Sequence, residues 1–254
     1  MKPYFIGHGS PLNAIADNAY ARFLRELGRR IEGHEGPIEA VVVFSAHWQT
    51  RGTKITGHAA PPQIYDFYGF PDGLYRLKYA PPGSPAAAAA IAAGLPEIAV
   101  DPDRGIDHAA WAVMRHLFPN ADVPLLEMSL NVDFTFEEHF ALGKKIAGLG
   151  LRNVLFVGSG NLVHNLYDVD FRDGAPAFAW AERANRWIRE RLEANESGAL
   201  VDAERAMPDF SRAAPTTEHF IPALYILGMT AGTLTVEYDE IQNGSVSMLA
   251  FSGE

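Results

Sequence analysis

The 254-residue chain contains no cysteine. This absence excludes a disulfide framework, thiolate metal ligands and a cysteine nucleophile, and it fits a reducing compartment. Positive charge is also scarce, because 21 Lys and Arg residues face 31 Asp and Glu residues and the formal net charge is −10. Since the basic residues are scattered rather than clustered, we expect no nucleic-acid partner and no binding to an anionic membrane.

Long apolar segments are missing as well. The longest uncharged apolar run, 86–96, is rich in alanine and too short to cross a bilayer. Met1-Lys2 leads almost directly into the first apolar run, and such a start does not have the features of a signal peptide. We therefore expect a protein of the cytoplasm that neither spans nor binds a membrane.

Strand-like and helix-like segments alternate along the chain. Runs rich in β-branched and apolar residues predict strands at 4–6, 40–45, 123–128, 154–157, 233–238 and 245–251. Apolar residues at helical spacing predict helices at 20–31 (capped by Asp17), 135–149, 178–192 and 218–229. Gln242-Asn243-Gly244 predicts a hairpin turn between the last two strands. The alternation predicts one α/β domain over 1–254, with a central mixed, largely parallel sheet flanked by helices.

Three histidines follow the predicted strand ends. His8 comes after the first strand, His47 after the second and His164 after the strand at 154–157, each beside small residues. Open α/β sheets bind ligands in the crevice at the carboxyl ends of their strands. Imidazoles gathered there predict a metal site, with rings that ligate the ion or transfer protons beside it. His219 and His108, each at the start of a predicted helix, are further candidates.

The other histidines and the glycine-rich motif do not add a second site. We interpret the histidines without strand-end or small-residue context as surface or capping residues: His34, His58, His116 and His139. Gly158-Ser159-Gly160 lacks the third glycine of a dinucleotide loop and the lysine of a phosphate loop. Neither a G-x-S-x-G nor an H-E-x-x-H motif occurs, which disfavours a serine hydrolase and the usual zinc protease.

Six motifs in a fixed order resemble one enzyme family. They are GHGSP, SAHW, PPQIYDFYGFPDGLY, DRGIDHAAW, GSGNLVHN and PTTEHFIPALY. In this order they resemble the class III extradiol ring-cleavage dioxygenases, and most of all the DOPA 4,5-dioxygenase-like subgroup. The resemblance runs from His8 to about Leu227. It implies a single α/β domain and a non-haem divalent metal, at which a catechol and dioxygen react and the aromatic ring opens beside its hydroxyl pair.

The resemblance also implies a role for each clustered histidine. By position in the motifs, the metal ligands are His8, His47 and His219, the last standing where the wider family has Glu. His164 is implied as the acid/base group, close enough to the metal to act as a fourth ligand. His108 is implied to contact substrate or oxygen. One departure from the subgroup is Ala109, which follows Asp107-His108 where glycine is common.

The implied reaction explains the need for these residues. A catechol reacts as the catecholate, and a histidine with a pKa of about 6.5 can take and return the proton near neutral pH. Three protein ligands leave positions open at the metal. We expect Fe(II) for turnover, since zinc has no accessible redox step, although three neutral imidazoles also suit Zn(II) in a purified sample. Tyr65, Phe67 and Tyr68, in an ordered loop at 61–82, are candidates to line the catechol pocket.

Two other functions stay open at this point. A metal-dependent hydrolase would use the same histidine site to activate water. A non-catalytic relative would keep the metal site for binding alone. Oxygen uptake in the presence of a catechol distinguishes the dioxygenase from both, and the sequence predicts no particular oligomeric state.

Overall fold

The computed structural model of the chain describes residues 1–34, 36–172 and 174–254. Its strands are β1 (Tyr4–Gly7), β2 (Ala40–Thr50), β3 (Thr53–Thr56), β4 (Ile98–Asp101), β5 (Leu125–Asn131), β6 (Val154–Gly160), β7 (Leu234–Tyr238), β8 (Ile241–Gln242), β9 (Val246–Ser247) and β10 (Ala250–Gly253). Eight of them form one sheet in the order β4-β3-β5-β2-β6-β1-β10-β7, and β8 pairs with β9 in a separate ribbon.

The centre of the sheet is parallel and its margins are mixed. β2 pairs in parallel with both β5 and β6, and β6 pairs in parallel with β1. β3 is antiparallel to β5, while β10 is antiparallel to β1 and to β7. The continuous apolar runs in β2 and β6 are buried, as strands covered on both faces must be. The predicted α/β fold with a mixed, largely parallel sheet is confirmed.

Helices cover both faces of the sheet. They are η1 (Pro11–Ala14), α1 (Ala19–His34), α2 (Asp72–Arg76), α3 (Pro85–Gly94), α4 (His108–Leu117), α5 (Phe136–Ala147), α6 (Ala179–Glu193), α7 (Ser197–Val201), α8 (Ala203–Ala206), α9 (Phe210–Ala213) and α10 (Ile221–Met229). None of the described helices combines the length and apolar character that a membrane crossing requires.

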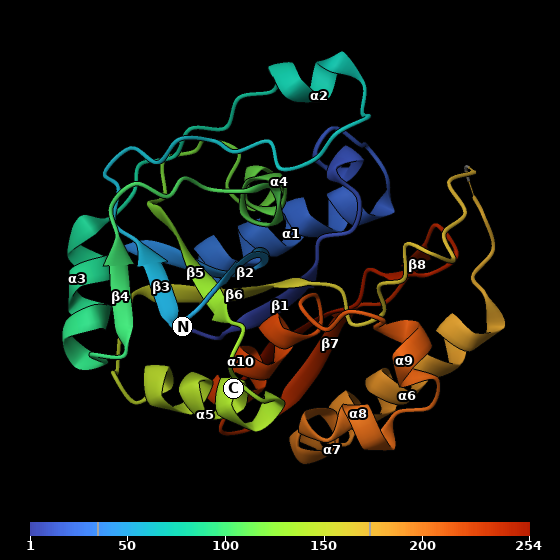
Figure 1. The fold of residues 1–254 in the computed structure, drawn as a ribbon. Helices are drawn as coiled ribbons and strands as arrows, with labels where there is room; N and C mark the ends of the chain where they lie inside the picture. The colour runs from blue at the N-terminus through green and yellow to red at the C-terminus, as the bar shows by residue number, and fades with distance from the viewer. Residues whose placement is uncertain (35, 173) are drawn as a thin grey trace.

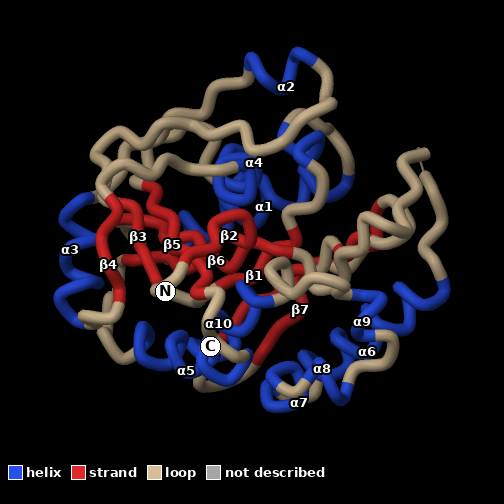
Figure 2. Tube along the Cα trace, viewed as in Figure 1, coloured by secondary structure: helices blue, strands red, loops and turns tan. Residues whose placement is uncertain are grey.

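The layers follow from the apolar stripes of these helices. In Figure 1, α1 and α4 lie on one face of the sheet, whereas α5 and α10 lie on the other and α6 to α9 continue beyond them. Figure 2 shows the strands between these two groups. Each interface has its own buried core, with Leu24 and Trp111 on the first face and Ile188 and Tyr225 on the second. The sheet is thereby fixed from both sides, and only the ends of its strands remain free to carry a site.

The strands differ from the prediction mainly at their ends. β2 does not stop at residue 45 but continues through Thr50, and β3 follows it after a short turn. The short strands β3 and β4 were not predicted, because Thr53–Thr56 and Ile98–Asp101 carry no clear alternating pattern. The predicted turn exists, with Asn243 and Gly244 at φ 54° and 74°. It closes the β8–β9 ribbon, however, while β7 pairs with β10.

Two local predictions were wrong. The first helix is capped by Asn18, whose side-chain oxygen accepts the amide of Ala21 at 2.8 Å, and the carboxylate of Asp17 instead pairs with Arg25. His116 and His139 are neither surface nor capping residues, because both are buried. Each buried ring has a hydrogen-bond partner that only the folded chain supplies. His116 bonds to the carbonyl oxygen of Asn13, and His139 bonds to the hydroxyl of Tyr225. His58 is exposed, as predicted, and the side chain of His34 lies outside the described residues.

Candidate metal centre

Five histidines meet at the carboxyl ends of the central parallel strands. His8 follows β1 directly, and His164 lies four residues after the end of β6. His108 is the first residue of α4, as predicted, whereas His219 lies in the turn just before α10 rather than inside a helix. His47 is not past the end of its strand but inside β2, where the pairing with β5 is interrupted by a register shift between residues 44 and 49.

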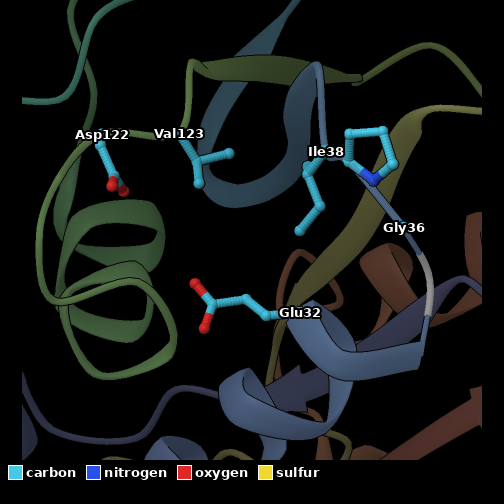
Figure 3. A pocket seen from close by; sticks show the side chains of 6 residues that line it. Glu32, Gly36, Ile38, Asp122 and Val123 are labelled. Carbon is cyan, nitrogen blue, oxygen red and sulfur yellow. The ribbon is translucent and has the colours of Figure 1, made fainter.

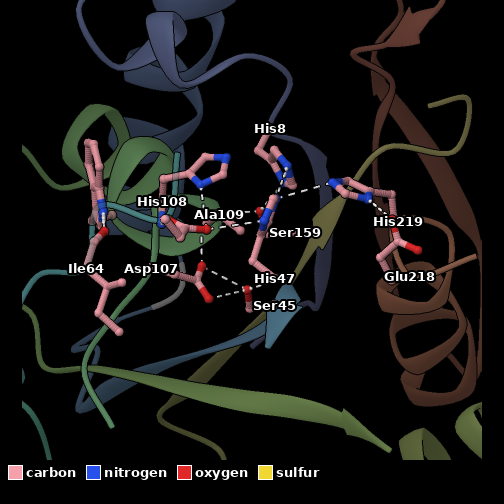
Figure 4. Close-up of polar contacts among 12 residues, drawn as sticks. His8, Ser45, His47, Ile64, Asp107, His108, Ala109, Ser159, Glu218 and His219 are labelled. Carbon is pink, nitrogen blue, oxygen red and sulfur yellow. Dashed lines mark hydrogen bonds and ion pairs between the residues drawn. The ribbon is translucent and has the colours of Figure 1, made fainter. Parts of the chain in front are cut away.

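The Nε2 atoms of three rings point at one another. The Nε2 atom of His47 lies 3.3 Å from that of His8 and 3.3 Å from that of His219 (Figure 4). Two nitrogens bound to one tetrahedral ion at about 2.0–2.1 Å stand roughly 3.3–3.4 Å apart. The observed separations therefore match a set of donors on a single divalent ion, and the chemistry of the donor set fits such an ion.

Hydrogen bonds on the far side of two rings fix their tautomers. The hydroxyl of Ser159 donates to the carbonyl oxygen of Ala109 at 2.6 Å, so it must accept from Nδ1 of His8 at 3.1 Å. Nδ1 of His219 donates to the carboxylate of Glu218 at 2.9 Å. With the proton on Nδ1, each Nε2 keeps a lone pair that faces the shared point, as in typical metal-ligating histidines.

A carboxylate that the sequence analysis missed links two other rings. Asp66 accepts hydrogen bonds from the backbone amide and Nδ1 of His108 at 3.0 and 2.9 Å, and its Oδ2 lies 3.2 Å from Nδ1 of His47. Burial favours a higher pKa for Asp66, but the bonds from His108 and the nearby rings lower it to about 2, so the carboxylate is ionised. The only sequence signal was an acidic residue inside an aromatic loop.

A further carboxylate, which is fully buried, links the backbone near two of the histidines. Asp107 caps α4 by accepting the amide of Ala109 at 3.1 Å, and it also accepts the hydroxyl of Ser45 at 2.9 Å. The same hydroxyl oxygen accepts the amide of His47 at 3.1 Å. Burial raises the pKa of Asp107, while Arg104 at 2.9 Å favours its ionised form. This network connects the bulged part of β2 to the start of α4.

His164 is placed beside the three converging rings. Its ring stacks on that of His219, with centroids 3.6 Å apart and planes 12° apart, and its amide donates to the carbonyl of Ala213. Potential ligand atoms of His164, Glu218 and His219 lie within 4.8 Å of one another, as do those of His8, His47 and His108. The five predicted histidines thus form two adjoining donor groups in one site.

Four of the five rings are held in the neutral form. Burial, followed by the electrostatic effect of neighbouring imidazoles, lowers the pKa of His47 to about 3 and that of His164 to about 2. The same causes lower the pKa of His8 and of His219 well below 6.5. Neutral imidazole is the form that binds a metal and the form that can accept a proton.

The glycines of the Gly158-Ser159-Gly160 motif have a packing role. A Cβ on Gly160 would lie 2.1 Å from the carbonyl oxygen of His219, and one on Gly158 would lie 2.5 Å from that of Pro222. Only glycine lets β6 approach the segment 219–222 so closely. Because the amide of Asn161 also donates to the carbonyl of His219 at 2.9 Å, this approach positions the third ring.

A large cavity opens onto the histidines. It has a volume of about 970 Å³, and its described lining includes Phe67 and Tyr68 of the predicted aromatic loop. Tyr65 lies behind Phe67 and is not among the lining residues described; its hydroxyl donates to the carbonyl of Leu77. The side chain of Ala109 is fully buried and does not face this cavity either.

A second, smaller hollow has no such chemistry. It measures about 380 Å³ and lies at the opposite, amino-terminal edge of the sheet, between the segments that precede β2 and β5 (Figure 3). Its described lining carries Glu32 and Asp122 but no histidine. The candidate site is therefore the histidine cavity.

Comparisons with known proteins identify the family of the chain. Residues 3–248 match the family model described as the catalytic LigB subunit of aromatic ring-opening dioxygenase. The "4,5-DOPA dioxygenase extradiol" of Escherichia coli is 37% identical, over 98% of this chain and 93% of that protein. The protein of the same name from Beta vulgaris is 32% identical, over 89% and 85%. The crystal structure of the uncharacterized protein JW3007 from Escherichia coli superposes with a TM-score of 0.83 at 32% identity, covering both chains completely.

Proposed function

The chain belongs to the LigB family of ring-cleaving extradiol dioxygenases, and from this premise we propose that it opens the ring of a catechol such as DOPA at a ferrous centre held by His8, His47 and His219. The observation that carries the proposal is the convergence of three Nε2 atoms, with that of His47 3.3 Å from each of the other two, in a cavity large enough for an aromatic substrate.

Iron is proposed over zinc for a chemical reason. Three neutral imidazoles suit either ion, and their affinity for zinc is normally the higher. Bound Fe(II) supplies a route for electrons between catechol and dioxygen that zinc, which has no redox step, lacks. We therefore expect zinc-loaded protein to be folded but inactive.

We propose that His164 moves the substrate proton. Its neutral ring stands beside the metal-binding rings and lines the cavity, which supports a role in taking a proton from one catechol hydroxyl and returning it to the product. Nδ1 of His108 donates to Asp66, and the ring of His108 lines the cavity. We propose that this ring, held in place by Asp66, orients the second hydroxyl.

The overall reaction balances without a further reductant. One catechol and one dioxygen give one ring-opened hydroxysemialdehyde that contains both oxygen atoms, and the bond that breaks joins a hydroxylated ring carbon to its unsubstituted neighbour. The product of a DOPA-like substrate can cyclise through its own amine. These steps need the metal, dioxygen and a group that carries a proton. The site offers imidazole nitrogens to bind the metal and further histidines to carry the proton.

An oxygen electrode tests the proposal. Protein reconstituted anaerobically with Fe(II) should consume oxygen and catechol in a 1:1 ratio and give a yellow product, whereas the zinc-loaded protein should consume none. If iron-loaded protein takes up no oxygen with DOPA, protocatechuate, caffeate, dopamine or 4-alkylcatechols, the proposed reaction is wrong, and hydrolysis or simple binding becomes the better explanation.

A further inference from the structure

Exposed apolar side chains gather around the mouth of the histidine cavity. Eight large hydrophobic residues are exposed among the residues that the structure describes, and five of these line this one cavity. The five, which we call the collar, are Leu12, Tyr68, Leu166, Tyr167 and Phe171. Exposed apolar residues are normally scattered singly, so a cluster of this kind indicates a binding surface.

The collar is built from three separate segments. Leu12 belongs to η1 just after β1, Tyr68 to the loop that also carries Asp66, and the other three to the segment 166–171 that follows His164. Phe171 is 73% exposed and Tyr167 is 86% exposed. Each of these segments also holds or adjoins a histidine or its partner, so the collar and the proposed metal site face the same cavity.

The described lining of the cavity offers a carboxylate no cationic lysine or arginine side chain. Among its described lining residues there is no Lys or Arg, and the only acidic side chains are Asp66 and Glu218. The arginines next to the segment 166–171 are already paired, since Arg172 binds Asp170 at 2.5 Å and Arg212 binds Asp168 at 2.7 Å. A carboxylate that entered here would meet the negative charge of Asp66 and Glu218, and it would find only uncharged donors, such as Gln49, in place of a cationic partner.

The volume of the histidine cavity also favours a substrate larger than catechol itself. At about 970 Å³ the cavity reaches the upper end of the range of roughly 300–1,000 Å³ that holds drug-sized ligands. A bare catechol would fill only a small part of it. Leu166 and Phe171 line the same cavity, which favours an apolar substituent packed against them.

We propose that the preferred substrate is a catechol with a large, uncharged apolar substituent, which packs against the collar while the hydroxyl pair faces the histidines. This inference rests on the proposed function, because it assumes that the catechol end of the ligand binds at the metal. It narrows the preferred substrates within the proposed function: DOPA and caffeate still react, but they bind more weakly than catechols whose substituent is uncharged.

Matched pairs of ligands test the charge preference. Caffeate and its methyl ester differ by one charge, as do DOPA and its methyl ester. Dissociation constants are measured by calorimetry on zinc-loaded protein, and KM values by oxygen uptake on iron-loaded protein. The ester should bind at least about tenfold more tightly than the acid in each pair. Equal binding, or tighter binding of the acids, would overturn the inference.

A series of 4-alkylcatechols tests the apolar contact. Burying one methylene should tighten binding by up to about fourfold until the chain extends beyond the collar. Phe171→Ala and Leu166→Ala should weaken hexylcatechol several-fold more than they weaken catechol itself. Val132→Ala, at a side chain 51% exposed and outside this lining, is the control and should change neither. Leu166→Arg should reverse the ester preference by giving caffeate a cationic partner.

The outcomes separate this inference from the proposed function. If no catechol consumes oxygen but zinc-loaded protein still prefers esters and long alkyl chains, the reaction is wrong and the ligand class stands. If oxygen is consumed but alkyl length has no effect on KM or on the dissociation constant, the ligand class is wrong. An apolar collar could instead join two copies of the chain, and analytical sedimentation tests this. If the protein is a dimer that dissociates in Phe171→Ala while the affinity for alkylcatechols is unchanged, the collar serves self-association and the proposal is overturned.

Discussion

Replacing Asp66 by Asn removes a single charge that faces two of the clustered rings. The carboxylate accepts Nδ1 of His108 at 2.9 Å through Oδ2, and the same oxygen lies 3.2 Å from Nδ1 of His47. Its other oxygen accepts the amide of His108 at 3.0 Å. An amide has only one oxygen, so in Asp66→Asn either the amide of His108 or the pair of Nδ1 atoms meets an NH₂ group instead of an acceptor.

The expected size of the effect follows from the lost contacts. A hydrogen bond to a charged group contributes roughly 1.5–3 kcal/mol, and loss of an outer partner of a metal-binding histidine typically lowers metal affinity or activity about 10–100-fold. Because Asp66 supports both a proposed ligand and a proposed substrate contact, we expect Asp66→Asn to lower both metal affinity and kcat within this range.

Chelator competition measures the first quantity and oxygen uptake at saturating Fe(II) measures the second. Asp17→Asn is the matched control, because that carboxylate pairs with Arg25 on the surface, and it should leave both unchanged. If Asp66→Asn is folded and keeps metal affinity and kcat within twofold of the parent protein, Asp66 does not position the rings and this part of the account is wrong.

Three further predictions concern the site and its support. His47→Ala should lose the metal, while His164→Ala should keep metal content nearly intact and lower kcat by roughly 10²–10⁴, as metal analysis and oxygen uptake will show. Burial lowers the pKa of His139 to about 4, whereas in the unfolded chain this ring has a pKa of about 6.5 and takes up a proton at higher pH. Between pH 6.5 and pH 4 this difference should lower the unfolding free energy of the metal-free protein by about 3 kcal/mol, which urea titration measures. Gly160→Ala should destabilise the fold by about 1–3 kcal/mol and weaken metal binding, because the new Cβ meets the carbonyl of His219.

Each of these has a result that would contradict it. Equal metal loss in the two histidine variants would make His164 a ligand and shift the proton transfer to His108. Replacement of His139 by Phe should make the unfolding free energy depend less steeply on pH between 6.5 and 4. An unchanged slope would show that His139 does not contribute to this dependence. For Gly160→Ala the control is Gly198→Ala, where the structure places no atom within 4 Å of the new Cβ. Similar stability and metal affinity in both glycine variants would refute the close-approach argument.

Local sequence patterns predict the parts of the fold that local physics determines. The apolar runs at 40–45 and 154–157 identify two central strands because strands buried on both faces need continuous apolar sequence. His8 was found by its place at a strand end. The sequence could not show that His47 lies on a bulge inside β2, because that bulge appears only when β5 is paired beside it.

Tertiary packing determines what the sequence left unseen. Asp66 and Glu218 are ordinary acidic residues in the sequence, and their roles depend on rings that approach from distant segments. His139 shares the buried face of α5 with Phe136 and Leu142, but its hydrogen-bond partner Tyr225 lies on α10, across the interface between the two helices, and no local pattern shows that contact. The adjacent residues Asp17 and Asn18 are both good helix caps, so only the backbone path decides between them.

Diffraction at the iron absorption edge from crystals of Fe(II)-loaded protein would locate the metal among the two adjoining donor groups. We predict a single anomalous peak about 2.0–2.2 Å from the Nε2 atoms of His8, His47 and His219. A peak held instead by His164, Glu218 and His219, or the absence of any peak in fully loaded protein, would contradict it.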